Sequence, residues 1–177
     1  MPKYVAFLRA INVGGHVVKM DQLRSSFTEL GFANVETFIA SGNVIFDSKS
    51  KNTQALERKI EKHLQAVLGY AVATFVRSIA EVGEIADYKP FAGRDIENDG
   101  FYIGFLSEAL NEETARKLQS CSTEIDVFHL RGRELFWLCR TSFRDSKFSG
   151  PLLEKTLGRR TTLRNSNTIK RIAAKYP

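Results

Sequence analysis

The sequence predicts an α+β fold with two ferredoxin-like halves of βαββαβ type in tandem, which share a core and carry extra helices. Three observations predict this fold. Apolar stretches of strand length alternate with segments whose apolar residues recur at the spacing of one helix face. The order strand, helix, strand, strand, helix, strand occurs twice along the chain. In each half, a short turn that contains glycine joins the two middle strands as a hairpin.

The first half is expected to span residues 1–87. Its expected strands cover residues 4–11, 35–40, 44–47 and 70–77. Asp21 suits the N-cap of the first helix, and Gly31 and Gly69 stand where the two helices should end in a left-handed residue. Ser78 suits the N-cap of a further short helix.

A connector at residues 88–100 is expected to lead into the second half, residues 101–177. The expected strands of that half cover residues 101–107, 124–130, 135–140 and 161–163. Asn111 suits the N-cap of its first helix, and Gly158 ends its second. A basic helix from Asn167 closes the chain. Because the connector is short and mixed in composition, we expect the two halves to share a core.

The composition is typical of a globular protein, and the motifs exclude several classes of function. The chain has 177 residues, 43% of them hydrophobic, and no apolar run reaches the length of a membrane span. The N-terminus lacks a signal peptide, and Cys121 and Cys139 form no CxxC pair, so we expect a bacterial-type cytoplasmic protein with free thiols. Walker and GxGxxG motifs are absent, which argues against a nucleotide triphosphatase. His16, His63 and His129 lack the spacing of metal ligands, so we expect neither a metal nor a cofactor.

Two loops of the first half are expected to lie together and to form a binding site. In a βαββαβ half the first two strands run in the same direction, so the loop after each of them lies at one end of the sheet. Both loops offer glycine backbone that a ligand can approach closely, with amide or hydroxyl side chains beside it. The alternative is that these residues only serve tight turns. The residues concerned are Asn12, Gly14, Gly15, Ser41, Gly42 and Asn43.

Two arginines lie next to segments that suit anion binding. Arg9 stands in an otherwise apolar strand before the first loop, so it either forms an internal ion pair, for example with Glu36, or binds a ligand. Arg164 and Asn165 precede the last helix, where they serve either as a helix cap or as part of an anion site. His16, beside the glycine loop, is the histidine that we would test as an acid or a base.

Charge is distributed unevenly along the chain. Residues 1–130 hold 14 Lys and Arg against 17 Asp and Glu, whereas residues 131–177 hold 12 against 3. This asymmetry points to an anionic partner such as nucleic acid, unless the basic tail packs on the acidic remainder. The RNP1 motif of RNA-recognition domains is absent. The basic residues that a nucleic acid would contact are Arg131, Arg133, Arg140, Arg144, Lys147, Arg159, Arg160, Lys170 and Arg171.

Three motifs carry a resemblance to a known family. LRAINVGG at 8–15, FIASGNVIF at 38–46 and TLRNSNT at 162–168 are similar to the DUF1697 family, which consists of bacterial proteins of unassigned function. The resemblance covers nearly the whole chain. It implies a fold of two α+β subdomains with ferredoxin-like halves, and it implies no activity.

A small anionic ligand, either a nucleotide or a phosphorylated metabolite, is the partner that these features favour. The expected ligand-binding residues are Arg9, Asn12, Gly14, Gly15, Ser41, Gly42 and Asn43, with Arg164 and Asn165 joining them from the C-terminal half. The alternatives are a nucleic-acid-binding module that uses the basic C-terminal quarter, and a non-catalytic interaction protein. The sequence leaves open whether the protein is an enzyme and what its oligomeric state is.

Overall fold

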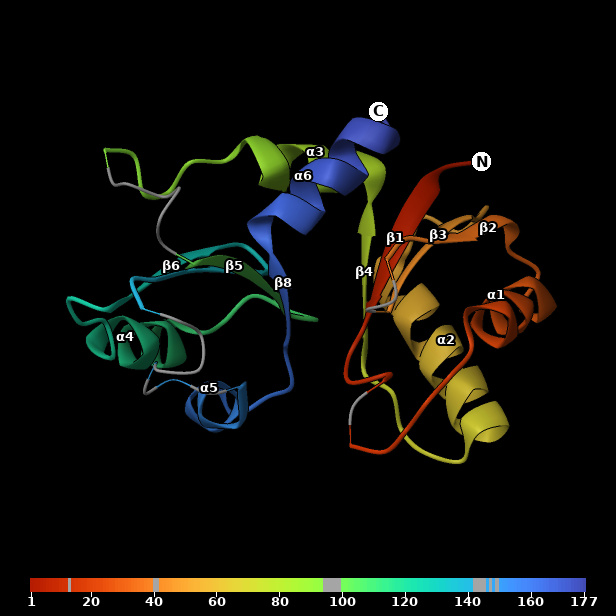
Figure 1. Cartoon of the computed structure of the whole chain (residues 1–177), viewed down its shortest axis with the longest axis horizontal. Coiled ribbons are helices and arrows are strands. Elements are labelled where there is room, and N and C mark those ends of the chain that lie inside the picture. The colour runs from red at the N-terminus through yellow and green to blue at the C-terminus, as the bar shows by residue number, and fades with distance from the viewer. Residues whose placement is uncertain (13, 40–41, 94–99, 142–145, 147, 149) are drawn as a thin grey trace. The chain divides into compact units, whose positions relative to one another are not determined.

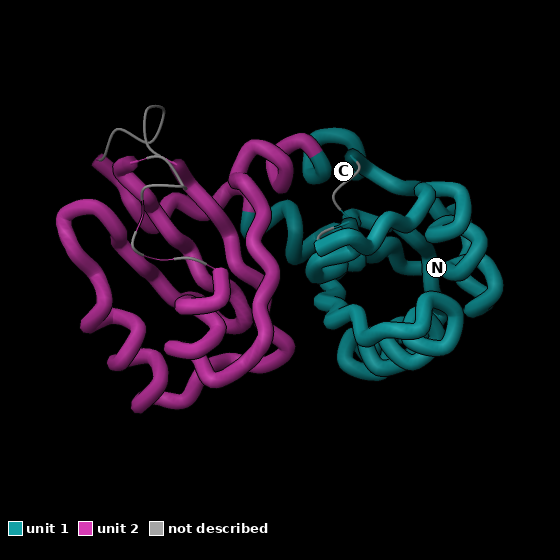
Figure 2. Tube along the Cα trace, turned by 60° about the horizontal axis from the view of Figure 1, so that its bottom comes forward, with its two compact units in different colours: residues 1–85, 172–177 teal, residues 86–171 magenta. Residues whose placement is uncertain are grey.

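The computed structural model describes residues 1–12, 14–39, 42–93, 100–141, 146, 148 and 150–177 (Figure 1). The chain forms two compact units, which Figure 2 shows in different colours. Unit 1 contains residues 1–85 and 172–177, and unit 2 contains residues 86–171. Helices α3 (Ile79–Asp87) and α6 (Ser166–Lys175) each contribute residues to both units. The C-terminal residues therefore belong to the same unit as the N-terminus.

Unit 1 is an antiparallel four-stranded sheet with helices packed against it. Its elements are β1 (Lys3–Leu8), α1 (Met20–Glu29), β2 (Ala33–Thr37), β3 (Asn43–Asp47), α2 (Thr53–Leu68), β4 (Thr74–Ser78) and most of α3. The strand order is β2-β3-β1-β4, and each neighbouring pair is antiparallel. The predicted βαββαβ order of the first half is therefore confirmed.

Unit 2 repeats this plan. Its elements are β5 (Gly100–Phe105), α4 (Glu112–Ser120), β6 (Asp126–Arg131), β7 (Glu134–Cys139), α5 (Gly150–Leu157), β8 (Thr162–Asn165) and the first part of α6. The strand order is β6-β7-β5-β8, and each neighbouring pair is again antiparallel. The predicted α+β class with two ferredoxin-like halves in tandem is thus confirmed. Within the described ranges, no helix combines the length and the apolar character needed to cross a bilayer.

Local capping signals set the ends of several helices. Asn52 caps α2 and Asn111 caps α4, because each side-chain oxygen accepts a backbone N–H of the first turn, at 3.0 and 2.8 Å. Gly69 ends α2 in the left-handed conformation, with a φ of 82°. The prediction that Asp21 caps α1 is wrong, because the helix begins at Met20 and Asp21 lies in its first turn.

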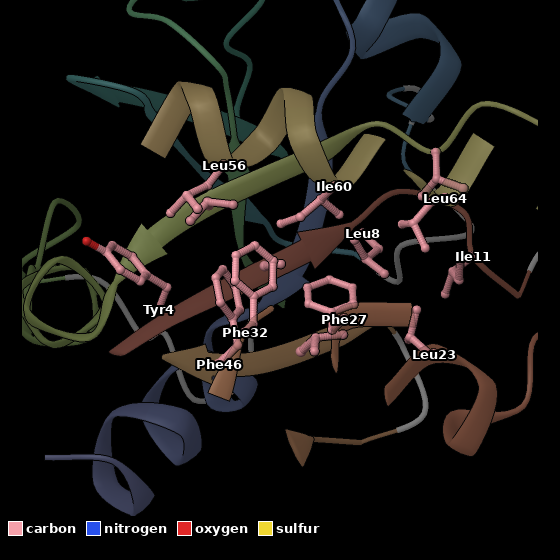
Figure 3. Packing of buried hydrophobic residues seen from close by; sticks show 14 of the residues in the cluster. Tyr4, Leu8, Ile11, Leu23, Phe27, Phe32, Phe46, Leu56, Ile60 and Leu64 are labelled. Atoms are coloured by element: carbon pink, nitrogen blue, oxygen red, sulfur yellow. The ribbon is translucent and has the colours of Figure 1, made fainter. Parts of the chain in front are cut away.

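The core of unit 1 lies between its sheet and helices α1 and α2 (Figure 3). The rings of Phe27, Phe32 and Phe46 fill its centre, with centroids 4.4 to 6.0 Å apart. Burying such a side chain contributes about 1.5–3 kcal/mol. Ile11 also belongs to this core although β1 ends at Leu8, so the prediction that the first strand reaches Ile11 is wrong. The apolar pattern continued past the strand because the loop itself contributes a buried residue.

Unit 2 has its own cluster of buried residues, which includes Trp137. The indole Nε1 of Trp137 donates a hydrogen bond to the buried carboxylate of Asp126 at 2.9 Å, and Ser146 Oγ donates to the same oxygen at 2.9 Å. These donors compensate the carboxylate for the water that it loses on burial. The expectation that the two halves share a core stays a prediction.

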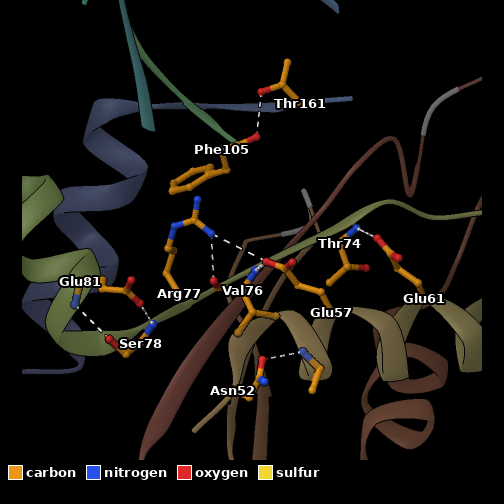
Figure 4. A network of polar contacts seen from close by, with 11 residues as sticks. Asn52, Glu57, Glu61, Thr74, Val76, Arg77, Ser78, Glu81, Phe105 and Thr161 are labelled. Atoms are coloured by element: carbon orange, nitrogen blue, oxygen red, sulfur yellow. Dashed lines mark hydrogen bonds and ion pairs between the residues drawn. The ribbon is translucent and has the colours of Figure 1, made fainter. Parts of the chain in front are cut away.

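Strand β4 lies at one edge of the sheet of unit 1, and helix α2 covers its outward N–H groups (Figure 4). The N–H of Val76 donates to Glu57 Oε1 at 2.8 Å, and the N–H of Thr74 donates to Glu61 Oε1 at 2.9 Å. The two glutamates lie one helical turn apart, which matches the spacing of alternate residues on the strand. An edge whose donors are already paired is a poor template for a further strand.

Candidate functional site

The two glycine loops of unit 1 meet at one end of its sheet, as the topology predicts. The N–H of Leu8 donates to the carbonyl of Gly42 at 2.8 Å. A Cβ added to Gly42 would lie 2.9 Å from Ile11 Cγ2 and 3.1 Å from Leu8 Cβ. Figure 3 shows the Leu8 and Ile11 side chains close together at this end of β1. Gly42 is therefore required for the close packing of the two loops, while Ser41 lies outside the described residues.

The backbone of both loops is strained. Ala10 and Ile39 have φ values of 55° and 58°, in the left-handed region that non-glycine residues avoid. Gly14 and Gly15, with φ of 68° and 84°, occupy the same region without that penalty. A β-branched residue such as Ile39 is especially unfavourable there, at a cost of about 1–3 kcal/mol. Backbone strain of this kind is concentrated at functional sites, so these two loops are a candidate functional site.

Three contacts hold the first loop in place. The N–H of Arg9 donates to the carbonyl of Ala73 at 2.9 Å, and Asn12 Oδ1 accepts the N–H of Val18 at 2.9 Å. Farther along, the imidazole of His16 stacks on the ring of Tyr70, with centroids 3.9 Å apart and an interplanar angle of 25°. Both the start and the end of the loop thus lie against the segment that precedes β4.

Gly14 and Gly15, between these contacts, are exposed, and a Cβ added at either would meet no atom within 4 Å. Their backbone is accordingly accessible to a ligand. Arg9, half-buried, follows β1 directly instead of lying inside the strand. Glu36, the partner suggested for Arg9, accepts hydrogen bonds from Tyr176 and Lys175 at 2.7 and 3.3 Å.

Asn12 and Asn43 both serve the conformation of their own loops. Asn12 closes the first loop through Val18. Asn43 is buried, and its Nδ2 donates to the carbonyl of Phe38 at 3.0 Å, which braces the β2–β3 hairpin. The binding roles expected for Arg9, Gly14 and Gly15 stay predictions.

Arg164 and Asn165 belong to β8 in unit 2, whereas the glycine loops belong to unit 1. Arg164 Nη1 donates to Thr162 Oγ1 at 2.8 Å and to the carbonyl of Leu163 at 3.0 Å, and burial lowers the pKa of its guanidinium to about 10. Asn165 Oδ1 accepts the N–H of Asn167 at 2.9 Å, which is a cap for α6. Their participation in one site with the loops stays a prediction.

Sequence reasoning overlooked Tyr70. Its hydroxyl oxygen is buried and has no hydrogen-bond partner among the described residues. The sequence feature that could have indicated Tyr70 was an aromatic residue directly after Gly69, which ends α2.

Elsewhere, Cys121 and Cys139 are free thiols, as predicted. The part of the chain that the structure describes contains no group of three or more His, Cys, Asp or Glu residues suited to hold a metal ion.

Comparison with known proteins identifies the family. The family model described as "Protein of unknown function (DUF1697)" matches residues 1–136. Among solved structures, the conserved bacterial protein SP0830 from Streptococcus pneumoniae is similar, with a TM-score of 0.79 and 26% sequence identity over 99% of this chain and 98% of that chain. No curated protein matches the chain. Because the family match covers more than half of the chain, the protein belongs to the DUF1697 family, whose function is unknown.

Proposed function

We propose that unit 1 binds a small anionic ligand, a nucleotide or a phosphorylated metabolite, at the loop that follows β1. One observation carries this proposal. Two loops with left-handed residues at Ala10, Gly14, Gly15 and Ile39 converge on one end of the sheet, and Arg9 lies beside them. Backbone N–H groups in such left-handed turns, together with the positive charge of an arginine, are features that favour the binding of an anion.

The chemistry of the loop suits a phosphate or a carboxylate. The guanidinium of Arg9 offers several N–H donors in a planar fork, which binds either anion in a bidentate manner. The exposed backbone at Gly14 and Gly15 offers N–H groups that a ligand approaches without hindrance from a Cβ. The proposal concerns binding and names no reaction.

The proposal is tested by thermal unfolding of the whole protein with inorganic phosphate, nucleoside phosphates and sugar phosphates. A ligand at a hundred times its Kd stabilises the folded state by about 2.7 kcal/mol, which raises the melting temperature. We expect at least one of these compounds to do so. The shift should disappear in Arg9→Ala and persist in Arg58→Ala, which removes one exposed positive charge of α2 in the same unit.

The melting temperature without ligand separates the two interpretations of Arg9. If Arg9 serves the ligand, Arg9→Ala should unfold at nearly the same temperature as the wild type. If it forms an internal ion pair instead, the substitution should destabilise the fold, by less than the roughly 3–5 kcal/mol that breaking a fully buried pair costs, because Arg9 is only half-buried. Failure of all these compounds to shift the wild-type protein, or an equal shift in wild type and Arg9→Ala, would contradict the proposal.

A second candidate, nucleic-acid binding by unit 2 and α6, is favoured by the basic C-terminal quarter. Several of its basic side chains are exposed: Arg131, Arg140, Arg160, Lys170 and Arg171. Arg144 and Lys147, which belong to the same expectation, lie outside the described residues. Lysine and arginine side chains on a surface bind the phosphates of nucleic acid without regard to sequence.

A further inference from the structure

We infer that the ligand of this loop carries a planar aromatic base and is therefore a nucleotide instead of a sugar phosphate. The inference rests on the anion site proposed above, and it adds that His16 binds the aromatic base of the ligand. His16 directly follows Gly14 and Gly15, and its exposed imidazole stacks on Tyr70 with centroids 3.9 Å apart. An exposed ring supported from behind by a second ring is a stacking platform for a nucleobase.

The platform and the anion donors are held against one short segment. Arg9 is fixed to this segment through Ala73, and His16 is fixed to it through Tyr70. The glycines stand between these two points in the chain, so a single loop presents a cation, exposed backbone N–H groups and an aromatic surface. A nucleotide combines the complementary features, an anionic phosphate and a flat base, in one small molecule.

Apolar side chains at the same end of unit 1 support an aromatic ligand. Val17, which follows His16, is 84% exposed, and Ile39 in the facing loop is 42% exposed. Ile39 also has a strained backbone, with a φ of 58°. The flat faces of a base make favourable contacts with such side chains, whereas a sugar phosphate offers them little apolar surface.

The test compares the four nucleoside 5′-monophosphates with ribose 5-phosphate by titration calorimetry on the whole protein at pH 8, where an ordinary histidine is neutral. We expect at least one nucleotide to bind about 5- to 150-fold more tightly than ribose 5-phosphate, which is the range that base–aromatic stacking supplies. His16→Ala should abolish this preference, because it lowers the affinity for the nucleotide much more than the affinity for ribose 5-phosphate.

His16→Phe should keep the preference, because it retains a flat ring and removes the ring nitrogens. His63→Ala, a substitution in α2 of the same unit, serves as the matched control and should also keep it. Equal affinity for nucleotides and ribose 5-phosphate would overturn the inference and leave the anion site standing. Loss of the preference in His16→Phe would likewise overturn it, because the nitrogens and not the ring face would then be responsible. If none of these compounds binds, the inference is overturned, and the thermal-unfolding test with the wider set of phosphates decides separately whether the anion site stands.

Discussion

Glycine is required at Gly42 for two reasons and at Gly14 for one. Both residues have a positive φ, 80° and 68°, which any side chain makes unfavourable. Only at Gly42 would a Cβ also collide with another residue, since Ile11 Cγ2 would lie 2.9 Å away. The space around Gly14 is open. Comparing a substitution at Gly42 with one at Gly14 therefore separates the cost of backbone strain from the cost of disturbed loop packing.

We predict that Gly42→Ala lowers the free energy of unfolding by about 2–4 kcal/mol, because the cost of overpacking adds to that of the backbone. Gly14→Ala should lower it by only about 1 kcal/mol, which is the backbone cost alone. Urea denaturation of both variants measures the difference. Equal losses would mean that the two loops do not pack against each other through Gly42.

The sequence predicts that these loops meet, but it does not predict which side chains touch. The meeting follows from topology, because the loops after two strands that run in the same direction share one end of the sheet. The contact of His16 with Tyr70 lies in a loop whose conformation includes a left-handed residue at Ala10, and the facing loop includes another at Ile39. Alanine and isoleucine disfavour that conformation, so no local propensity signals it. Strained positions are where local reasoning should fail.

Helix α6 ends on the edge strand β2 of unit 1. The hydroxyl of Tyr176 donates to Glu36 Oε2 at 2.7 Å, and Lys175 Nζ lies 3.3 Å from the same oxygen. The ring of Tyr176 also meets that of Phe38 edge-on, with centroids 6.4 Å apart. Helical spacing and the basic composition predict the helix itself. Its partner strand is far away in the sequence, and no periodicity encodes a contact of that range.

This contact makes part of the stability depend on pH. The hydrogen bond from Tyr176, with a further contribution from Lys175, lowers the pKa of Glu36 below its ordinary value of 4.5. A carboxylate whose pKa is lowered by folding stabilises the fold above its ordinary pKa, and this stabilisation is lost as the pH falls through the lowered pKa. Glu36→Gln should therefore be less stable than the wild type at neutral pH, and the difference should shrink as the pH falls below 4.5.

Urea denaturation at several pH values measures this effect. Glu84→Gln, which alters an exposed glutamate of α3, is the control and should change stability little at any pH. A difference between Glu36→Gln and the wild type that stays constant from neutral to acidic pH would show that the ionised form of Glu36 contributes nothing to folding.

The charge distribution of the whole molecule is open to two interpretations, and the structure offers support for each. Lys175 pairs with Glu36, so at this point the basic tail is balanced by the acidic part of the chain. By contrast, the side chains of Arg160 and Lys170 are exposed, as binding to an external anionic partner requires. A count of charges does not separate internal balance from an external partner, whereas the dependence of binding on salt does.

If the basic quarter binds duplex DNA, the logarithm of the association constant should fall linearly with that of the salt concentration, with a slope of about −0.9 for each phosphate neutralised. Replacing both Arg159 and Arg160 by alanine should weaken binding to all sequences alike and make the slope shallower by about 1–2 units. The control replaces Arg116 and Lys117, two exposed basic residues of α4 in the same unit, and should leave the slope unchanged. Fluorescence anisotropy with a labelled duplex measures each slope.

Equal slopes for the wild type and both double variants, or an association constant that does not change with salt concentration, would leave internal charge balance as the explanation of the basic quarter. Because Arg9 lies outside that quarter, Arg9→Ala should bind the duplex like the wild type even where it no longer responds to a small anion.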